Sequence, residues 1–399
     1  MSIESLPEHI RMPHLRPFQP LPVQKDGKQF VALRDPAMLT QQTMVVPPQV
    51  LGILQHFRGE RTIDQIAAEI GGQVNQFADL AKALDQVGLL WGPTFERMES
   101  EVKEKVRAAG AFPAFASASM GTDAAACRAA IEGYFAETED PEIEGTIVGV
   151  VAPHLDYQRG WPNYAAAYHG LRNTTAPDRI VILGTNHFGI GDGVIMSEFG
   201  FDSPMGRCPA DSTVVSAMVE KLGRPLIVDQ LDHLPEHSIQ LHLPWLQYCF
   251  GNVPVVGVLV PDPLTPMIED DGERVSFEHF VTTMNDVLDQ VGGRTLFVAS
   301  SDLSHVGPQF GEPRPVDEQR RMDVEQHDRE MMAKYLSADA EEFLAAMRWN
   351  KNPTRWCSIG NMAAALMLAK PEAVELIDYR QAYDDAGNVL VSSAAMVMV

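Results

Sequence analysis

The chain has 399 residues, a length that predicts two or three domains and a large buried core. Hydrophobic residues make up 45% and charged residues 21%, which excludes a disordered, fibrous or collagen-like chain. With 31 basic against 54 acidic residues the formal charge is −23, and so acidic a surface repels phosphate backbones and anionic lipid headgroups. We therefore expect no nucleic-acid partner and no membrane partner.

The distribution of apolar residues predicts a cytoplasmic protein. No apolar run approaches the roughly 20 residues of a membrane-spanning helix, and residues 1–7 lack a basic region followed by an apolar one. The four cysteines are far apart and form no CxxC pair, which argues against a disulfide framework and a structural zinc knuckle. They are Cys127, Cys208, Cys249 and Cys357.

The first hundred residues predict a small separate module, because they carry 11 acidic and 9 basic side chains while the rest of the chain carries most of the negative charge. Short strands are expected at 30–33 and 45–46. Helices are expected from Val50 to near Gly59, from a Thr62/Gln65 capping box onward, and through Phe77–Val87. In the second helix the expected buried face is Ile63, Ile66, Ala67 and Ile70.

Three helices followed by the short apolar strand Leu89–Trp91 have the order of a winged-helix domain. A helix that reads DNA needs several basic residues, and the third helix offers only Lys82 against Asp79 and Asp85. The segment "MVVPPQVLGILQHFRGERTIDQIAAEIG" resembles instead the peptide-binding winged helices of the PqqD type, which hold a peptide by strand addition. The alternative is a helical cap that packs on the body of the protein.

A connecting region follows the front module. It contains a charged amphipathic helix at 95–109, a linker rich in small residues at 110–121 and a helix at 123–135. The predicted division is therefore a winged-helix-like domain at 1–93, a helical linker region at 94–145 and an α/β domain at 146–399.

In the α/β domain, three β-branched strands each run into a polar turn. Residues 146–151 lead to His154, residues 179–183 lead to His187, and residues 294–299 lead to Asp302 and His305. Continuous apolar strands separated by helices predict a mixed, largely buried central sheet with helices on both faces, and ligands in such folds collect at the strand ends. A single histidine after a strand is usually a loop residue, but three at separate strand ends favour a common site.

Two further segments add candidate residues. The segment "PEHSIQLHLPW" predicts an amphipathic helix with His237 pointing into the cleft, while His242 lies on another helical face and is interpreted as structural. Cys357 stands at the start of an apolar helix, where unpaired N–H groups and the nearby Arg355 would stabilise a thiolate. Of the four cysteines, Cys357 is the predicted ligand or nucleophile.

The body of the chain resembles the Memo family, also called AmmeMemoRadiSam system protein B. The similar segments extend from Thr146 to the end of the chain. They are "VAPHLDYQRGWPNYAAAYHGL", "ILGTNHFG", "PEHSIQLHLPWLQ", "VASSDLSHVG", "WCSIGNMAAALML" and "VSSAAMVMV". Two positions depart from the family pattern: Phe188 stands where the family often has a second histidine, and Ser358-Ile359-Gly360 stands where Gly-Arg-His is common.

This resemblance implies a fold similar to class III extradiol dioxygenases. It also implies a metal site of His154, His187 and Cys357, with His237, Asp302 and His305 beside it. Two imidazoles and a thiolate suit Fe(II) first, with Cu or Zn as alternatives, and disfavour Mg and Ca. We expect His305 to be a general acid or base, Asp302 to orient it, and His237 to contact either a metal-ligand residue or the substrate.

The expected function is a metal-dependent, dioxygenase-like oxidoreductase acting on a small-molecule or peptide substrate. A thiolate beside iron and O2 is readily oxidised, which leaves two alternatives open. One is a noncatalytic metal- or peptide-binding partner of radical-SAM and AMMECR1-like proteins, as the family's system name implies. The other is a zinc hydrolase, in which zinc-bound water is activated.

Overall fold

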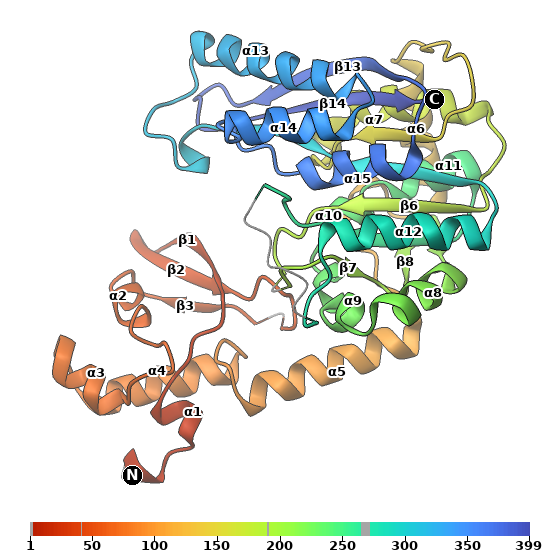
Figure 1. The fold of residues 1–399 in the computed structure, drawn as a ribbon. Helices are drawn as coiled ribbons and strands as arrows, with labels where there is room; N and C mark the ends of the chain where they lie inside the picture. Colours follow the sequence, from red (N-terminus) through yellow and green to blue (C-terminus); the bar gives the residue numbers. More distant parts are fainter. Residues whose placement is uncertain (1–2, 41, 190, 265–271) are drawn as a thin grey trace. The chain divides into compact units, whose positions relative to one another are not determined.

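The computed structural model describes residues 3–40, 42–189, 191–264 and 272–399 (Figure 1). These residues form two compact units, one up to Ala109 and the other from Gly110 onward. Each unit has a hydrophobic core of its own. The boundaries expected at residues 93 and 145 stay predictions.

The first unit combines a three-stranded antiparallel sheet with short helices. Its strands are β1 (Gln19–Lys25), β2 (Lys28–Arg34) and β3 (Met44–Val46), in that order across the sheet. Its helices are α1 (Glu8–Arg11), α2 (Val50–Leu54), α3 (Ile63–Ile70), α4 (Val74–Gln86) and α5 (Pro93–Ala109). The capping box at the start of α3 is confirmed, since the Thr62 N–H donates to the Gln65 side chain at 3.0 Å. The predicted burial of Ile70 is wrong, because this residue ends α3 and is exposed.

The second unit is built on an eight-stranded mixed sheet, which confirms the predicted fold class. The strand order is β12-β14-β5-β11-β6-β10-β7, with β13 beside β14. The four central strands run parallel; they are β5 (Gly149–Ala152), β11 (Thr295–Ser300), β6 (Arg179–Gly184) and β10 (Val255–Leu259). The others are antiparallel to their neighbours; they are β7 (Ile195–Met196), β12 (Asp302–Val306), β13 (Val374–Tyr383) and β14 (Leu390–Met398).

Helices cover both faces of this sheet, as Figure 1 shows. One face carries α8 (Ser212–Leu222), α12 (Phe277–Val291), α13 (Glu318–Tyr335), α14 (Ala340–Asn350) and α15 (Ile359–Ala369). The other carries α6 (Ala124–Ala136), α7 (Tyr157–His169), α10 (His237–Gln240) and α11 (Leu243–Phe250), while the four-residue α9 (Pro225–Val228) packs near β7. The segment expected to be a linker instead contains β4 (Ala111–Phe112), which pairs with β8 (Gly200–Ser203), itself paired with β9 (Gly206–Cys208).

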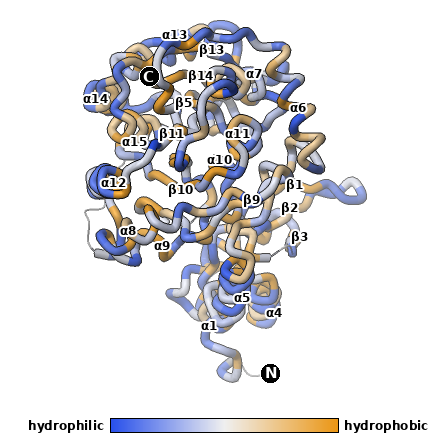
Figure 2. Tube along the Cα trace, turned by 90° about the vertical axis from the view of Figure 1, so that its right-hand side faces the viewer, coloured by the Kyte–Doolittle hydropathy of each residue, from blue (hydrophilic) through white to orange (hydrophobic). Residues whose placement is uncertain are grey.

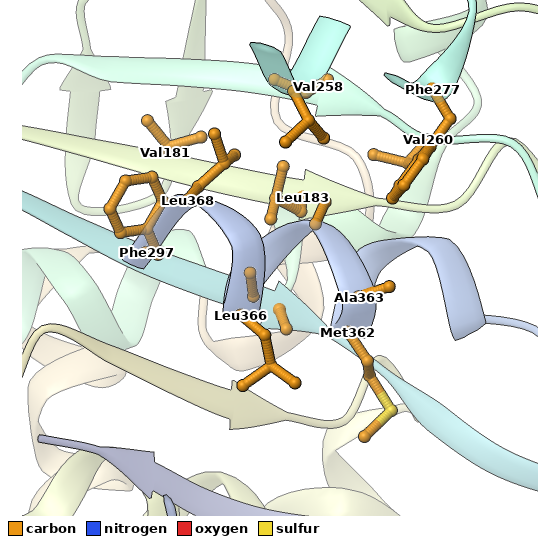
Figure 3. Packing of buried hydrophobic residues seen from close by; sticks show 14 of the residues in the cluster. Val181, Leu183, Val258, Val260, Phe277, Phe297, Met362, Ala363, Leu366 and Leu368 are labelled. Carbon is orange, nitrogen blue, oxygen red and sulfur yellow. The ribbon is translucent and has the colours of Figure 1, made fainter. Parts of the chain in front are cut away.

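Helix α15 packs closely on the central strands. Figure 3 shows Met362, Ala363 and Leu366 of α15 beside Leu183 of β6 and Phe297 of β11. The approach is close because the first turn contains glycine: a Cβ at position 360 would collide with the carbonyl oxygen of Pro261. This packing fixes the start of α15, and so the preceding loop, against the ends of the parallel strands.

The hydropathy pattern agrees with this layered architecture. In Figure 2 hydrophobic residues concentrate on the central strands of the second unit, while the outer turns of α12 and α14 are largely hydrophilic. Within the part of the chain that the structure describes, no helix is long and apolar enough to cross a membrane.

A stack of aromatic rings fills the core between α7 and α11. Tyr164 and Tyr168 stack on Trp245 at centroid distances of 5.7 and 5.9 Å. His242 lies in the same layer, fully buried, with its Nδ1 2.8 Å from the Tyr168 hydroxyl. His242 is therefore part of the core, as predicted. Burial lowers the pKa of His242 to about 3.

We predict that His242 makes the protein sensitive to acid. The pKa of this ring is about 3 in the folded protein against 6.5 normally, so the unfolded chain takes up the proton first. Stability from the neutral ring is present above pH 6.5 and is lost as the pH falls toward 3. Replacement His242→Gln should reduce the pH slope of the unfolding free energy by about 1.4 kcal/mol per pH unit. Urea denaturation between pH 6 and 4 measures this slope.

Tyr168→Phe is the matched control, because it removes the hydroxyl that bonds to His242 but leaves the imidazole buried. This variant should keep the slope of the original protein. An unchanged slope in His242→Gln would contradict the prediction.

Candidate metal centre

Three side chains from distant segments meet at the carboxyl ends of the parallel strands. His154 follows β5, His187 follows β6, and Cys357 precedes α15. One ligand atom from each lies within 4.8 Å of the other two. The Cys357 Sγ is 3.3 Å from the His154 Nε2. The ring centroids of His154 and His187 are 4.9 Å apart. A sulfur and a nitrogen bound to one tetrahedral ion lie about 3.5 Å apart, so these atoms are spaced as ligands of one cation would be.

His154 forms the deep wall of this cluster and is 2% exposed. Its Nδ1 lies 3.1 Å from the Ser300 hydroxyl, and its backbone N–H donates to Asp302 Oδ1 at 3.0 Å. Burial, together with the nearby His187 and His237, holds the pKa of His154 well below its usual range. The ring is therefore neutral at pH 7, with Nε2 directed toward Cys357.

His187 and His237 share one buried carboxylate. Glu236 is fully buried, and its Oε1 lies 3.1 Å from the His187 Nδ1 and 3.2 Å from the His237 Nδ1. The ring of His237 is 4.8 Å from that of His187 and 5.3 Å from that of His154. His237 therefore lies beside two of the three candidate ligands, His154 and His187.

Glu236 and Asn361 are site residues that the sequence analysis missed. Glu236 is not singled out from the sequence, although its place directly before His237, at the N-cap of α10, was an available signal. The Asn361 amide donates to the Ser300 carbonyl at 2.7 Å and to the Thr185 hydroxyl at 2.9 Å. It thereby ties α15 to the ends of β11 and β6.

The expected activation of Cys357 by a helix start is wrong for the metal-free protein. Helix α15 begins at Ile359, two residues later. Burial and the nearby carboxylates of Asp302 and Glu236 raise the pKa of the Cys357 thiol. Arg355 turns to Glu312, with an N–O distance of 3.1 Å. A cation bound at the cluster would supply positive charge that favours the thiolate.

The expected pairing of Asp302 with His305 is also wrong. Both residues lie in strand β12 rather than in a loop, and the pairing of β12 with β14 shifts register between them. Asp302 bonds to His154, whereas the Nδ1 of His305 faces the carbonyl oxygens of Leu303 and Arg355 at 3.0 and 3.2 Å. Burial lowers the pKa of His305 to about 4, so its ring does not titrate near neutral pH. Burial raises the pKa of Asp302 to about 7.

The cluster is exposed on the side formed by His187 and His237. The side chains of His187 and His237 are 23% and 28% exposed, in contrast to the buried His154. Phe188 is exposed next to them, with its ring centroid 5.9 Å from both imidazoles. A ligand would therefore approach the cluster along these three rings.

The protein is of the α/β class, with a mixed sheet and a cluster of two histidines and a cysteine at the ends of its parallel strands. The model of the Memo-like protein family matches residues 112–398, and the chain belongs to that family. A MEMO1 family protein of Methanothermobacter thermautotrophicus is 32% identical over 207 residues, covering 49% of this chain and 70% of the relative. One of Methanopyrus kandleri is 30% identical over 264 residues, covering 63% and 83%. One of Thermotoga neapolitana is 33% identical over 159 residues, covering 40% and 53%.

We predict that Cys357 is a slow nucleophile in the metal-free protein. Its raised pKa leaves little thiolate at pH 8, where an ordinary cysteine is partly ionised. Alkylation of Cys357 by iodoacetamide, followed by peptide mass spectrometry, should be at least roughly tenfold slower in the folded protein than in the urea-unfolded chain. Equal rates would show that the thiolate is present without a cation. The variant Cys357→Ser identifies the alkylated peptide that contains residue 357, because this peptide is not alkylated at that position in the variant.

Proposed function

We propose that this protein is a metal-dependent oxidoreductase, dioxygenase-like in its site, whose ion is held by His154, His187 and Cys357. The observation that supports this most directly is the convergence of the three donor atoms within 4.8 Å at the ends of parallel strands. Each ligand has a partner that orients it: Ser300 for His154, Glu236 for His187 and Ser358 for Cys357.

The donor set matches a borderline-soft transition metal. Two imidazoles and one thiolate suit Fe(II), Cu or Zn, whereas Mg and Ca prefer oxygen ligands. When bound, an iron or copper ion would supply one-electron chemistry and an open position for O2 or substrate. We place Fe(II) first, with Cu and Zn as alternatives.

The residues around the cluster have separate proposed roles. His154, buried between Ser300 and Asp302, would hold its ligand nitrogen in place. His237 would contact a small-molecule or peptide substrate from the open side, where Phe188 supplies an apolar surface. His305 would serve as a proton acceptor rather than a proton donor at neutral pH, because its pKa of about 4 keeps the ring neutral.

We predict that Cys357→Ser and His154→Ala each lose stoichiometric metal. Protein purified without oxygen should hold about one ion per chain, measured by elemental analysis. Replacement of a ligand should weaken Co(II) binding by at least roughly tenfold and, in Cys357→Ser, abolish the sulfur-to-cobalt charge-transfer band. Cys127→Ser, which alters a buried cysteine of α6, is the control and should bind normally. Absence of stoichiometric metal from the unaltered protein would refute the proposal.

The metal found in these preparations separates the redox function from the zinc hydrolase. Zn(II) has no d–d or EPR signal, whereas Fe(II) treated with nitric oxide and Cu(II) both give EPR spectra. Stoichiometric zinc without iron or copper would favour activated water over electron transfer.

A second function, peptide presentation to radical-SAM and AMMECR1-like partners, is favoured by the first unit. Its sheet has two edges, β1 and β3. Strand β1 contains Pro20 and Pro22, which pair with residues of β2 and lack N–H donors, so its outer edge is a poor template for another strand. Strand β3 has no proline, and its Val45 is exposed. We propose β3 as the edge of a PqqD-like winged helix that accepts a peptide.

We predict that Val45→Pro weakens binding of a partner peptide at least roughly tenfold, because it removes a backbone donor and stiffens the edge. Leu21→Ala in β1 should leave binding unchanged. Pull-down of radical-SAM and AMMECR1-like proteins with both variants, followed by peptide titration, provides the measurement. Equal binding by Val45→Pro and the unaltered chain would exclude strand addition at β3.

A further inference from the structure

Glu236 has more hydrogen-bond donors around it than any role as a helix cap requires. Its Oε1 accepts from the Ser238 N–H at 2.8 Å, and its Oε2 accepts from the His187 N–H at 2.8 Å. The Nδ1 atoms of His187 and His237 then approach the same carboxylate at 3.1 and 3.2 Å. The Ser238 N–H alone satisfies the cap, so the contacts of Glu236 with His187 and His237 need a separate explanation.

A carboxylate in this position determines which ring nitrogen of each histidine carries hydrogen. An ionised carboxylate can only accept hydrogen bonds, so a ring nitrogen at 3.1 or 3.2 Å must be the donor. Each oxygen of Glu236 already accepts a backbone N–H at 2.8 Å, and both Nδ1 atoms lie within hydrogen-bond distance of Oε1, which is the arrangement of a carboxylate that only accepts. When the ring is neutral, the nitrogen that faces Glu236 is therefore the protonated one, Nδ1, and the free lone pair is on Nε2. Although burial favours the neutral ring, Glu236 raises the pKa of His237, so this ring becomes neutral only at a higher pH than an ordinary histidine.

The same three residues are also spaced closely enough to hold a second ion. Two observations favour hydrogen bonding instead. Both carboxylate oxygens already accept backbone N–H groups at 2.8 Å, and Glu236 is fully buried. An ion bound by the Nδ1 atoms of His187 and His237 would need a lone pair on each of these atoms. Both atoms instead carry hydrogen, because they donate to Glu236.

We propose that Glu236 is a positioning residue that sets His187 and His237 in the same Nδ1–H tautomer. His187 thereby offers Nε2 to the metal, and His237 offers Nε2 as a hydrogen-bond acceptor beside it. The site would then select ligands that carry an O–H or N–H donor next to the atom facing the ion. The statement that His187 offers Nε2 to a metal rests on the proposed function. The tautomers of the two rings do not, because they are set by Glu236 without a metal.

The tautomers can be measured directly in the metal-free full-length protein labelled with ¹⁵N-histidine. Long-range ¹H–¹⁵N spectra distinguish Nδ1–H from Nε2–H, and His187→Gln and His237→Gln assign the two rings. At a pH high enough for both rings to be neutral, we expect both to be Nδ1–H. In Glu236→Gln at least one should change to Nε2–H, because the amide must place a donor where the carboxylate accepted one. An Nε2–H ring in the unaltered protein, or unchanged tautomers in Glu236→Gln, would overturn the proposal.

Metal titration tests the consequence for the cluster. Co(II) affinity should fall roughly 10- to 100-fold in Glu236→Gln, the usual effect of losing a partner of a ligand histidine. His237→Gln, which leaves the contact of Glu236 with His187 intact, should bind Co(II) within about threefold of the unaltered protein, and thermal unfolding shows whether each variant folds. Equal affinity in Glu236→Gln would refute the positioning role.

The outcomes separate this inference from the proposed function. If the unaltered protein binds no metal, the proposed function fails, but the tautomer spectra still decide the role of Glu236. If two Co(II) ions bind per chain and Glu236→Gln loses one, Glu236 is a ligand of a second ion and the inference is wrong.

Discussion

The site depends on two buried carboxylates that hold three imidazole rings in place. Glu236 and Asp302 are similarly buried, yet their pKa values move in opposite directions. Two backbone N–H groups and two imidazoles surround Glu236, and these donors outweigh the cost of burial. Asp302 has fewer donors, so burial dominates. Glu236 therefore stays ionised to a lower pH than Asp302 does.

Strand order explains why much of the site could be predicted from the sequence. Strands β5, β11 and β6 are parallel neighbours, so the turns that follow them meet at one edge of the sheet. The apolar strands, with His154 and His187 after two of them, already indicate this arrangement in the printed sequence. The approach of Cys357 depends instead on α15 packing across the same strands, and there the family resemblance supplied the expectation.

The wrong predictions have a common physical cause. The thiol pKa of Cys357 depends on carboxylates from two distant segments, which no local pattern near Cys357 contains. The partner of Asp302 depends on β12 being a strand with a register shift, whereas the polar sequence "SSDLSH" is typical of a turn. Glu236 was missed for a similar reason: its importance comes from His187, 49 positions earlier in the chain. Local chemistry indicates which residues can act, but tertiary contacts determine their protonation and partners.

The two departures from the family pattern both affect the approach to the cluster. Ser358 places its hydroxyl 3.1 Å from the Cys357 sulfur, and the close packing of Gly360 on Pro261 leaves no room for a side chain there. Phe188 adds an apolar ring on the open side. A ligand of this protein therefore meets an aromatic surface and the His237 ring rather than a basic pair.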